Sequence, residues 1–154
     1  MRLSIAQAAD KGIKLSSVEK TEKKRDPNDP CLFCKDPRGV SLEHELAYSA
    51  RDTYAVSPGH TLIIPRRHVA SFFDLTPAEI NACMGLITEE RMRLDEEFKP
   101  DGYNIGVNVG PAAGQSIFHV HIHLIPRYQG DVENPQGGVR HVIPKKGHYT
   151  RKTV

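Results

Sequence analysis

The sequence GQSIFHVHIHLIP, from Gly114 to Pro126, decides how the rest of this chain is interpreted. Apolar and imidazole side chains alternate along it. The apolar positions are Phe118, Val120, Ile122 and Leu124, and the positions between them are His119, His121 and His123. Because successive side chains of a strand point to opposite faces, this pattern predicts a strand over 116–126 with one apolar face and one histidine face.

Three histidines on one strand face indicate chemistry, since a core face favours aliphatic side chains and a solvent face rarely repeats histidine. At a rise of about 3.3 Å per residue the outer two Cα atoms lie roughly 13 Å apart, so one metal ion can bind two neighbouring histidines but scarcely all three. The row can instead follow a polyphosphate, with the middle imidazole attacking phosphorus while its neighbours donate hydrogen bonds. A metal-dependent hydrolase and a phosphoryl-transfer enzyme both remain open at this point.

The segments upstream of the histidines predict a hairpin of two strands. The pattern over 45–54 is typical of a strand, a turn follows at 57–59, and 60–65 is typical of a buried strand that ends at Pro65. A further strand is predicted over 103–109, with Tyr103, Ile105, Val107 and Val109 on its buried face. Tight turns between neighbouring strands predict antiparallel pairing.

A long helix is predicted between these strand pairs. Thr76 can cap it, Pro77 suits its first position, Glu79 completes a Thr-x-x-Glu capping box, and Pro100 ends it. Its predicted core face consists of Ile80, Cys83, Met84, Ile87, Leu94 and Phe98. We therefore expect an α+β fold, an antiparallel β-sheet with one long helix packed on it.

Length, composition and charge limit the possible domain organisation of the chain. A chain of 154 residues, 38% hydrophobic and 26% charged, fits one domain, and it contains neither an apolar run of about 20 residues nor a secretory signal, so we expect a cytoplasmic protein without membrane contact. Residues 1–27 carry seven Lys and Arg against four Asp and Glu, and residues 136–154 carry five against none. We expect an extension over 1–30, a domain over 31–130 and a basic tail over 131–154. Basic ends of this kind are usually solvated, so no specific nucleic-acid binding is expected.

The histidine stretch resembles the His-φ-His-φ-His-φ-φ signature, φ being apolar, of the histidine-triad nucleotide hydrolases and transferases. The resemblance runs from about Cys31 to Arg127, and the segment 130–140 is similar to bacterial members of the diadenosine-tetraphosphate-hydrolase-like group. It implies a histidine-triad (HIT-like) fold. It also implies a homodimer that pairs through the long helix and the strand preceding the triad.

The resemblance implies roles for the histidines. His121 would attack the α-phosphorus of a purine nucleotide, and water would then cleave the nucleotidyl-imidazole to release a nucleoside monophosphate. His123 would help protonate the leaving group, while His60 and His119 would hydrogen-bond around the phosphate. The substrate would be a dinucleoside polyphosphate or a nucleoside phosphoramidate. A nucleotidyltransferase or phosphorylase, and a nucleotide-binding partner protein with vestigial activity, are the alternatives.

Four polar residues are implied as substrate contacts by the same resemblance. Asp52 would bind the ribose hydroxyls, which a carboxylate at a strand end can do, although such an aspartate can equally cap a turn. The other three, which would donate to phosphate or leaving-group oxygens, are Asn108, Gln115 and Ser116.

The cysteines suggest a metal in place of disulfides. Three cysteines are too few for a disulfide framework, and the Cys31-x-x-Cys34 spacing fits a zinc knuckle, although a redox pair or unrelated core thiols are the alternatives. The resemblance offers His68 and His119 as the remaining ligands of a structural zinc. In that case His119 cannot donate freely to substrate, and it instead fixes the segment that carries His121. Cys83 is interpreted as a core residue of the helix.

Overall fold

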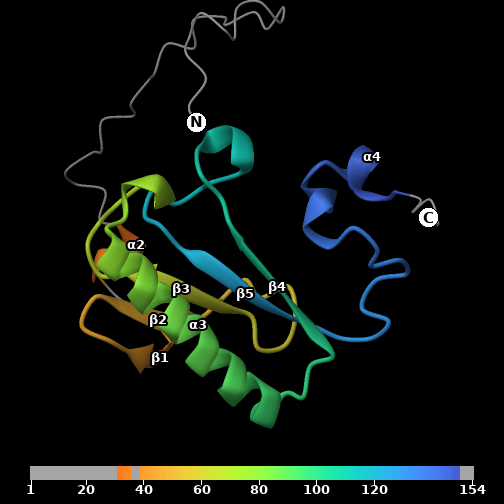
Figure 1. Cartoon of the computed structure of the whole chain (residues 1–154), viewed down its shortest axis with the longest axis horizontal. Coiled ribbons are helices and arrows are strands. Elements are labelled where there is room, and N and C mark those ends of the chain that lie inside the picture. The colour runs from red at the N-terminus through yellow and green to blue at the C-terminus, as the bar shows by residue number, and fades with distance from the viewer. Residues whose placement is uncertain (1–30, 36–38, 150–154) are drawn as a thin grey trace, which may run out of the picture.

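The computed structural model describes residues 31–35 and 39–149, and it confirms the expected α+β fold. Five strands form one antiparallel sheet in the order β1-β2-β3-β5-β4, and a long helix crosses one face of the sheet (Figure 1). The strands are β1 (Val40–Glu43), β2 (Ala47–Arg51), β3 (Thr61–Pro65), β4 (Gly102–Val107) and β5 (Ile122–Arg127). The helices are α2 (Leu32–Lys35), α3 (Pro77–Glu97) and α4 (Pro144–Gly147), with 3-10 turns η1 (Phe72–Asp74), η2 (Pro111–Ala113) and η3 (Gly138–Val142). The predicted extension over 1–30 lies outside the described residues.

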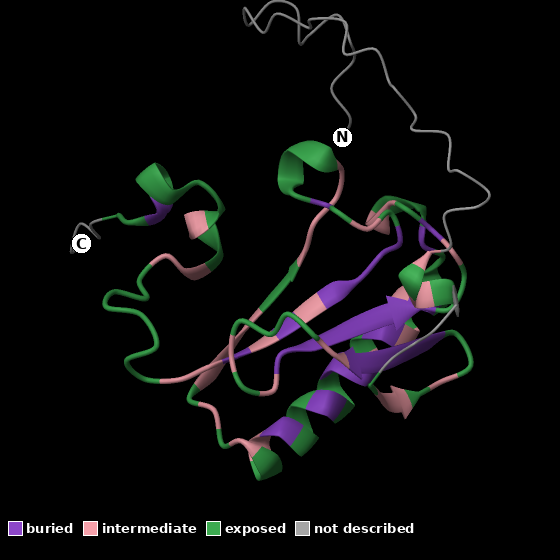
Figure 2. Ribbon diagram, turned by 180° about the vertical axis from the view of Figure 1, so that it is seen from behind, coloured by how far each residue is buried: buried purple, intermediate pink, exposed green. Residues whose placement is uncertain are grey.

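The sheet is buried on both faces at its centre, where β3 lies (Figure 2). Ile63 of β3 packs into the core between the sheet and α3, whereas Leu62 and Ile64 pack on the opposite face with Tyr48 and Ala50. This double burial explains why 60–65 shows a continuous apolar run instead of alternation. It also leaves the face opposite α3 with an apolar floor.

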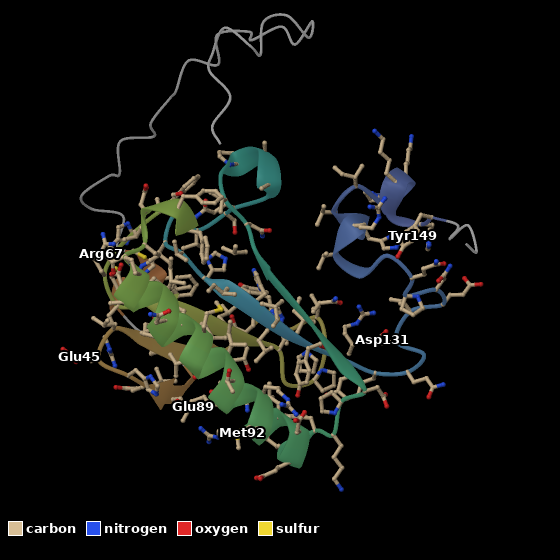
Figure 3. The ribbon with its side chains drawn as sticks, in the orientation of Figure 1. Glu45, Arg67, Glu89, Met92, Asp131 and Tyr149 are labelled. Carbon is tan, nitrogen blue, oxygen red and sulfur yellow. The ribbon has the colours of Figure 1, made fainter. Side chains whose placement is uncertain are left out.

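The capping box of α3 is confirmed. The Thr76 hydroxyl accepts a hydrogen bond from the Glu79 backbone N–H at 3.3 Å, and the Glu79 carboxylate accepts one from the Thr76 N–H at 2.8 Å. Arg67 also donates two hydrogen bonds to this carboxylate, at 2.7 and 2.8 Å, and Figure 3 shows it beside the first turn of the helix.

The predicted core face of α3 is partly wrong. Cys83, Ile87 and Leu94 are buried as expected, but Met84 is 42% exposed. The buried stripe continues instead through Leu86 and Glu90. Glu90 accepts hydrogen bonds from Ser49 at 2.5 Å and from Arg51 at 3.5 Å. A carboxylate therefore occupies a buried position of the helix, which apolar periodicity does not predict.

The strand predicted over 116–126 is shorter than expected, because β5 begins only at Ile122. β4 ends at Val107 and β3 pairs with β5 only over Thr61–Ile63, so the preceding residues have no ladder partner. They run beside the chain after β3, where the Val120 N–H donates to the Val69 carbonyl at 2.7 Å. Val120, Ile122 and Leu124 are buried as predicted, but Phe118 is 43% exposed.

The residues after β5 form a small lobe beside the β4 side of the sheet (Figure 1). Hydrogen bonds within the segment hold η3 and α4 together, including those from Arg140 to the Lys146 carbonyl and from Gln136 to the Tyr149 carbonyl. Tyr149 is labelled on this lobe in Figure 3. Among the described residues, no helix has both the length and the apolarity needed to cross a membrane.

Candidate active site and metal centre

The histidine row is divided between two neighbouring environments. His119 is completely buried and lies among two cysteines and another histidine, whereas His121 and His123 line a cavity on the sheet face opposite α3. The division occurs because 119 and 121 precede β5, where the chain is not held to the alternation of a flat strand. The three imidazoles therefore do not act as one row.

Cys31, Cys34, His68 and His119, hereafter the Cys/His cluster, each offer one ligand atom within 4.8 Å of the others. Cys31 Sγ lies 3.4 Å from His119 Nδ1, Cys34 Sγ lies 3.4 Å from His68 Nδ1, and the two Nδ1 atoms lie 3.2 Å apart. Tetrahedral zinc bonded to sulfur at about 2.3 Å and to nitrogen at about 2.0 Å has nitrogen–nitrogen and sulfur–nitrogen edges of about 3.3–3.5 Å and a sulfur–sulfur edge of about 3.8 Å. The donor set and its spacing therefore fit a four-coordinate zinc ion.

The ring of His119 is oriented for metal binding. Its Nε2 lies 2.7 Å from the Pro65 carbonyl, which can only accept, so the proton is on Nε2 and the lone pair is on Nδ1, toward the thiols. Both ring nitrogens are thus engaged away from the cavity. This placement favours the metal-ligand role of His119 over its predicted contact with phosphate.

The cavity has a volume of about 480 Å³, a size that suits a nucleotide. Its lining combines apolar and polar residues. The apolar residues include Leu32, Phe33, Tyr48, Leu62, Ile64 and Ile117, and the polar residues include Asp52, Thr53, Ser116, His121 and His123. An aromatic base matches the first group, and a sugar and phosphates match the second.

His121 presents a lone pair to this cavity. Its Nδ1 lies 2.8 Å from the His119 carbonyl and must donate to it, so the neutral ring leaves Nε2 unprotonated. The side chain is 7% exposed and lines the cavity. An unprotonated imidazole nitrogen on a residue that lines a cavity is chemically able to act as a nucleophile.

His60 and His123 form a second histidine pair. The Val56 backbone N–H donates to His60 Nδ1 at 3.3 Å, so His60 Nε2 carries the proton and donates to His123 Nδ1 at 3.0 Å. Neutral His123 then carries its proton on Nε2. Burial, with smaller contributions from His121 and His60, lowers the pKa of His123 to about 4, and burial also lowers the pKa of His60. His123 is therefore a neutral hydrogen-bond donor near pH 7.

Asp52 serves a turn and also reaches the cavity. One carboxylate oxygen accepts from the Tyr54 N–H at 2.8 Å, as in a turn-capping aspartate, while the other lies 3.4 Å from His60 Nδ1. The residue also lines the cavity. Both roles considered from the sequence are compatible with this geometry.

The three predicted neutral donors are placed differently. Ser116 lines the cavity. Gln115 is buried, accepts from the Gly110 N–H at 2.8 Å, and donates to the Ala70 and Ile117 carbonyls at 2.7 and 3.2 Å. Its amide therefore braces the loop that carries Ser116. Neither Gln115 nor Asn108 is among the residues that line the cavity.

Sequence reasoning missed the apolar side of the cavity. Leu32 and Phe33 lie between the two cysteines, and the Phe33 ring centroid is 5.4 Å from that of His121. The signal was present, since two large apolar residues inside a metal-binding Cys-x-x-Cys turn need somewhere to pack.

The chain matches known proteins over most of its length. The HIT domain family matches residues 35–130. The AP-4-A phosphorylase of Mycobacterium tuberculosis is 31% identical over 144 residues, which cover 85% of this chain and 73% of that protein. The adenylylsulfatase HINT3 of Arabidopsis thaliana is 37% identical over 106 residues, covering 66% of this chain and 54% of that protein. A crystal structure of a Zn-bound histidine triad family protein from Mycobacterium smegmatis superposes with a TM-score of 0.62 at 31% identity, covering 68% of this chain and 79% of that one.

Proposed function

Because this chain belongs to the HIT domain family, whose members include nucleotide-processing enzymes, we propose that it is a nucleotide hydrolase that works through a nucleotidyl-histidine intermediate. The observation that carries the proposal is the tautomer of His121. Its Nδ1–H is held by the His119 carbonyl, so its Nε2 lone pair faces a cavity of nucleotide size. The substrate is a dinucleoside polyphosphate or a nucleoside phosphoramidate with a purine base.

In the first step His121 Nε2 forms a bond to the α-phosphorus, and the bond from phosphorus to the leaving group breaks. The Nε2–H of His123 donates to the leaving oxygen or nitrogen, which departs with that proton. The negative phosphates of a bound substrate raise the pKa of His123 and so counteract the effect of burial. In the complex with substrate, the pair of His60 and His123 beside Asp52 therefore holds an additional proton. In the second step water attacks phosphorus, the bond from phosphorus to His121 Nε2 breaks, and one water proton returns to the His60–His123 pair, so that nucleoside monophosphate and free His121 are released.

The contacts proposed for substrate follow the lining of the cavity. The base packs against Leu32 and Phe33, the ribose hydroxyls bind Asp52, and Ser116 donates to a phosphate oxygen. Asn108 and Gln115, implied as further donors by the family resemblance, stay predictions; the hydrogen bonds of Gln115 support a bracing role for it.

A panel of dinucleoside polyphosphates, nucleoside phosphoramidates and adenylylated amines tests the proposal, with products separated by chromatography. Turnover that releases nucleoside monophosphate, together with a trapped nucleotidyl adduct on His121, supports it. Binding without turnover across the whole panel contradicts it and leaves the alternative of a nucleotide-binding partner protein.

Phosphorolysis is the second candidate, favoured by the phosphorylase named among the relatives, which matches 85% of this chain. In that reaction inorganic phosphate replaces water in the second step. The product is then a nucleoside diphosphate instead of a monophosphate. Repeating the panel in phosphate buffer and in phosphate-free buffer separates the two reactions.

We also propose that the Cys/His cluster holds one structural zinc ion. Two thiolates and two imidazoles complete a tetrahedral shell and leave no position for an activated water, so the ion would supply stability instead of catalysis. This complete shell disfavours a metal-dependent hydrolase. If a weak external chelator lowered the rate of the zinc-loaded protein, the result would favour that alternative.

A homodimer is the proposed assembly. β4 is at the edge of the sheet, and its Ile105 is 49% exposed although the pattern predicted a buried face. Met84 and Met92 on α3 are exposed as well. A dimer that pairs these elements would cover them, and light scattering at micromolar concentration tests it, a monomeric mass counting against it. The cytoplasmic location, the domain boundaries and the absence of specific nucleic-acid binding stay predictions.

A further inference from the structure

The turn that carries both cysteines also forms a wall of the cavity. α2 places Leu32 and Phe33 in the cavity lining. The Phe33 ring centroid lies 5.8 Å from that of His119 and 5.4 Å from that of His121. One short segment therefore contacts the Cys/His cluster on one side and the proposed nucleophile on the other.

This turn depends on few contacts with the sheet in the part of the chain that the structure describes. A single helical turn of four residues is too short to be stable by itself. The Tyr48 hydroxyl donates to the Phe33 carbonyl at 2.9 Å, while the hydrogen bond from the Cys34 N–H to the Cys31 carbonyl stays within the turn. The Cys/His cluster links the turn to residues beyond β3 and before β5, beside the ring contacts that Phe33 makes with His119 and His121.

We propose that metal loading of the Cys/His cluster sets the affinity of the cavity for nucleotides, because the metal fixes the turn whose Leu32 and Phe33 form the base-binding wall. The inference rests on the proposed function, since it takes the cavity to be the nucleotide site. With zinc bound, the bonds from Cys31 and Cys34 would tie the turn through the ion to His68, which follows β3, and to His119, which precedes β5. Without zinc, the wall is held mainly by the Tyr48 hydrogen bond and by the packing of Phe33.

A second route from the metal to the cavity predicts a different effect. The His119 carbonyl accepts from His121 Nδ1 at 2.8 Å, so loss of metal from His119 would disturb the nucleophile. A disturbed nucleophile lowers kcat, whereas a lost wall weakens nucleotide binding. Affinity for a nucleotide that is not turned over therefore reports on the wall.

The test measures the affinity of AMP by calorimetry, using the full chain with zinc, after chelator treatment and dialysis, and after zinc is added back. AMP binding should weaken roughly tenfold or more without zinc, because one base–aromatic contact has an effect of that order, and added zinc should restore it. Zinc-loaded Phe33→Ala should show a similar loss while keeping one zinc, and removing its zinc should weaken AMP binding little further. Cys83→Ala, which changes a buried cysteine of α3, is the control and should behave like wild type.

Each result of these measurements supports or overturns a named part of the proposal. Equal AMP affinity with and without zinc, within about twofold, overturns the coupling and leaves the proposed function standing. Full zinc dependence in Phe33→Ala overturns the Phe33 wall as the route. No AMP binding by zinc-loaded wild type contradicts the proposed function together with this inference. If circular dichroism shows that the zinc-free chain unfolds, zinc-loaded Phe33→Ala decides alone, and unchanged AMP affinity in that variant overturns the proposal.

Discussion

His119 and His121 are two residues apart, yet they lie in opposite kinds of site. Both nitrogens of His119 are engaged, one with the Pro65 carbonyl and the other among the thiols of the Cys/His cluster. His121 uses one nitrogen for the His119 carbonyl and presents the other to the cavity.

In each imidazole one ring nitrogen donates to a backbone carbonyl, and this hydrogen bond decides which nitrogen keeps its lone pair. A backbone carbonyl fixes the tautomer in both cases, but it holds Nε2–H of His119 and Nδ1–H of His121. The lone pair of His119 therefore lies among the ligand atoms of the Cys/His cluster, whereas that of His121 belongs to a residue that lines the cavity. In the proposed function the first binds a structural zinc ion and the second attacks phosphorus.

The largest expected effect is on turnover in His121→Ala. The change removes the nucleophile, so kcat should fall by about 10⁴-fold or more, while the affinity for AMP stays within several-fold of wild type because the base and ribose contacts remain. Steady-state kinetics and calorimetry measure the two quantities. Activity within a few-fold of wild type would refute the covalent mechanism.

The next largest effect is on the stability that the Cys/His cluster contributes. Replacing Cys31 and Cys34 by Ser should abolish tight zinc binding and lower the melting temperature by roughly 10 °C or more, since a structural metal adds its binding free energy to folding. Differential scanning calorimetry measures the change against Cys83→Ala. An unchanged melting temperature would show that the fold does not depend on the metal.

The pH dependence of kcat/KM tests the cavity side of the comparison, where His121 and His123 lie. Because the pKa of His123 in the free protein is lowered to about 4, His123 stays neutral as the pH falls through 6.5, where an ordinary histidine gains a proton. The pH dependence of kcat/KM, which reports on the free enzyme, should therefore have no component from His123 near pH 6.5 and should include one near pH 4.

The variant His123→Gln keeps a hydrogen-bond donor but cannot gain this proton. Its kcat/KM should be low and should lack the component near pH 4. A pH profile of this variant that keeps the component near pH 4 would assign that component to another group.

The smallest effect lies outside both sites, at the start of α3. The hydrogen bonds from Arg67 and Thr76 lower the pKa of Glu79 to about 2, so this carboxylate adds stability at pH values above about 4.5 and that contribution is lost as the pH falls toward 2. Glu79→Gln should lower the melting temperature at pH 7 by roughly 2–6 °C, because glutamine can still accept from the Thr76 N–H but loses the charge paired with Arg67, and by less at pH 2.

The matched control for this prediction is Glu89→Gln. Glu89 is an exposed residue of the same helix, labelled in Figure 3, and its carboxylate lies 3.2 Å from His44 Nε2. Its substitution should change the melting temperature by less than about 1 °C, because exposed ion pairs contribute little. Equal effects of the two substitutions would mean that the ion pair of Glu79 with Arg67 stabilises the fold no more than an exposed ion pair does.

The sequence predicted those features that depend on local pattern. The hairpin of β2 and β3, the capping box of Thr76 and Glu79, and the α+β class follow from periodicity and turn residues. β1 was not predicted, because it is four residues long and its register is broken by a bulge between Val40 and Leu42. The start of β5 was misplaced, because strand length depends on where its partners end.

The site was predictable in its residue types but not in its partners. Alternation placed three histidines together, and the family resemblance brought Cys31 and Cys34 to His68 and His119. The separation of His119 from His121 was foreseen only as a consequence of zinc binding, since it depends on which carbonyl each ring nitrogen meets. The bracing role of Gln115 and the wall formed by Phe33 depend on contacts between residues far apart in the chain, which no local pattern contains.

Zinc content in the paired variants His119→Ala and His121→Ala tests the division of the histidine row most directly. After dialysis against a weak chelator, elemental analysis should find about one zinc per chain in wild type and in His121→Ala, but at least several-fold less in His119→Ala, which loses one of four ligands. Equal zinc content in the two variants, or less than a tenth of an equivalent in wild type, would contradict the account.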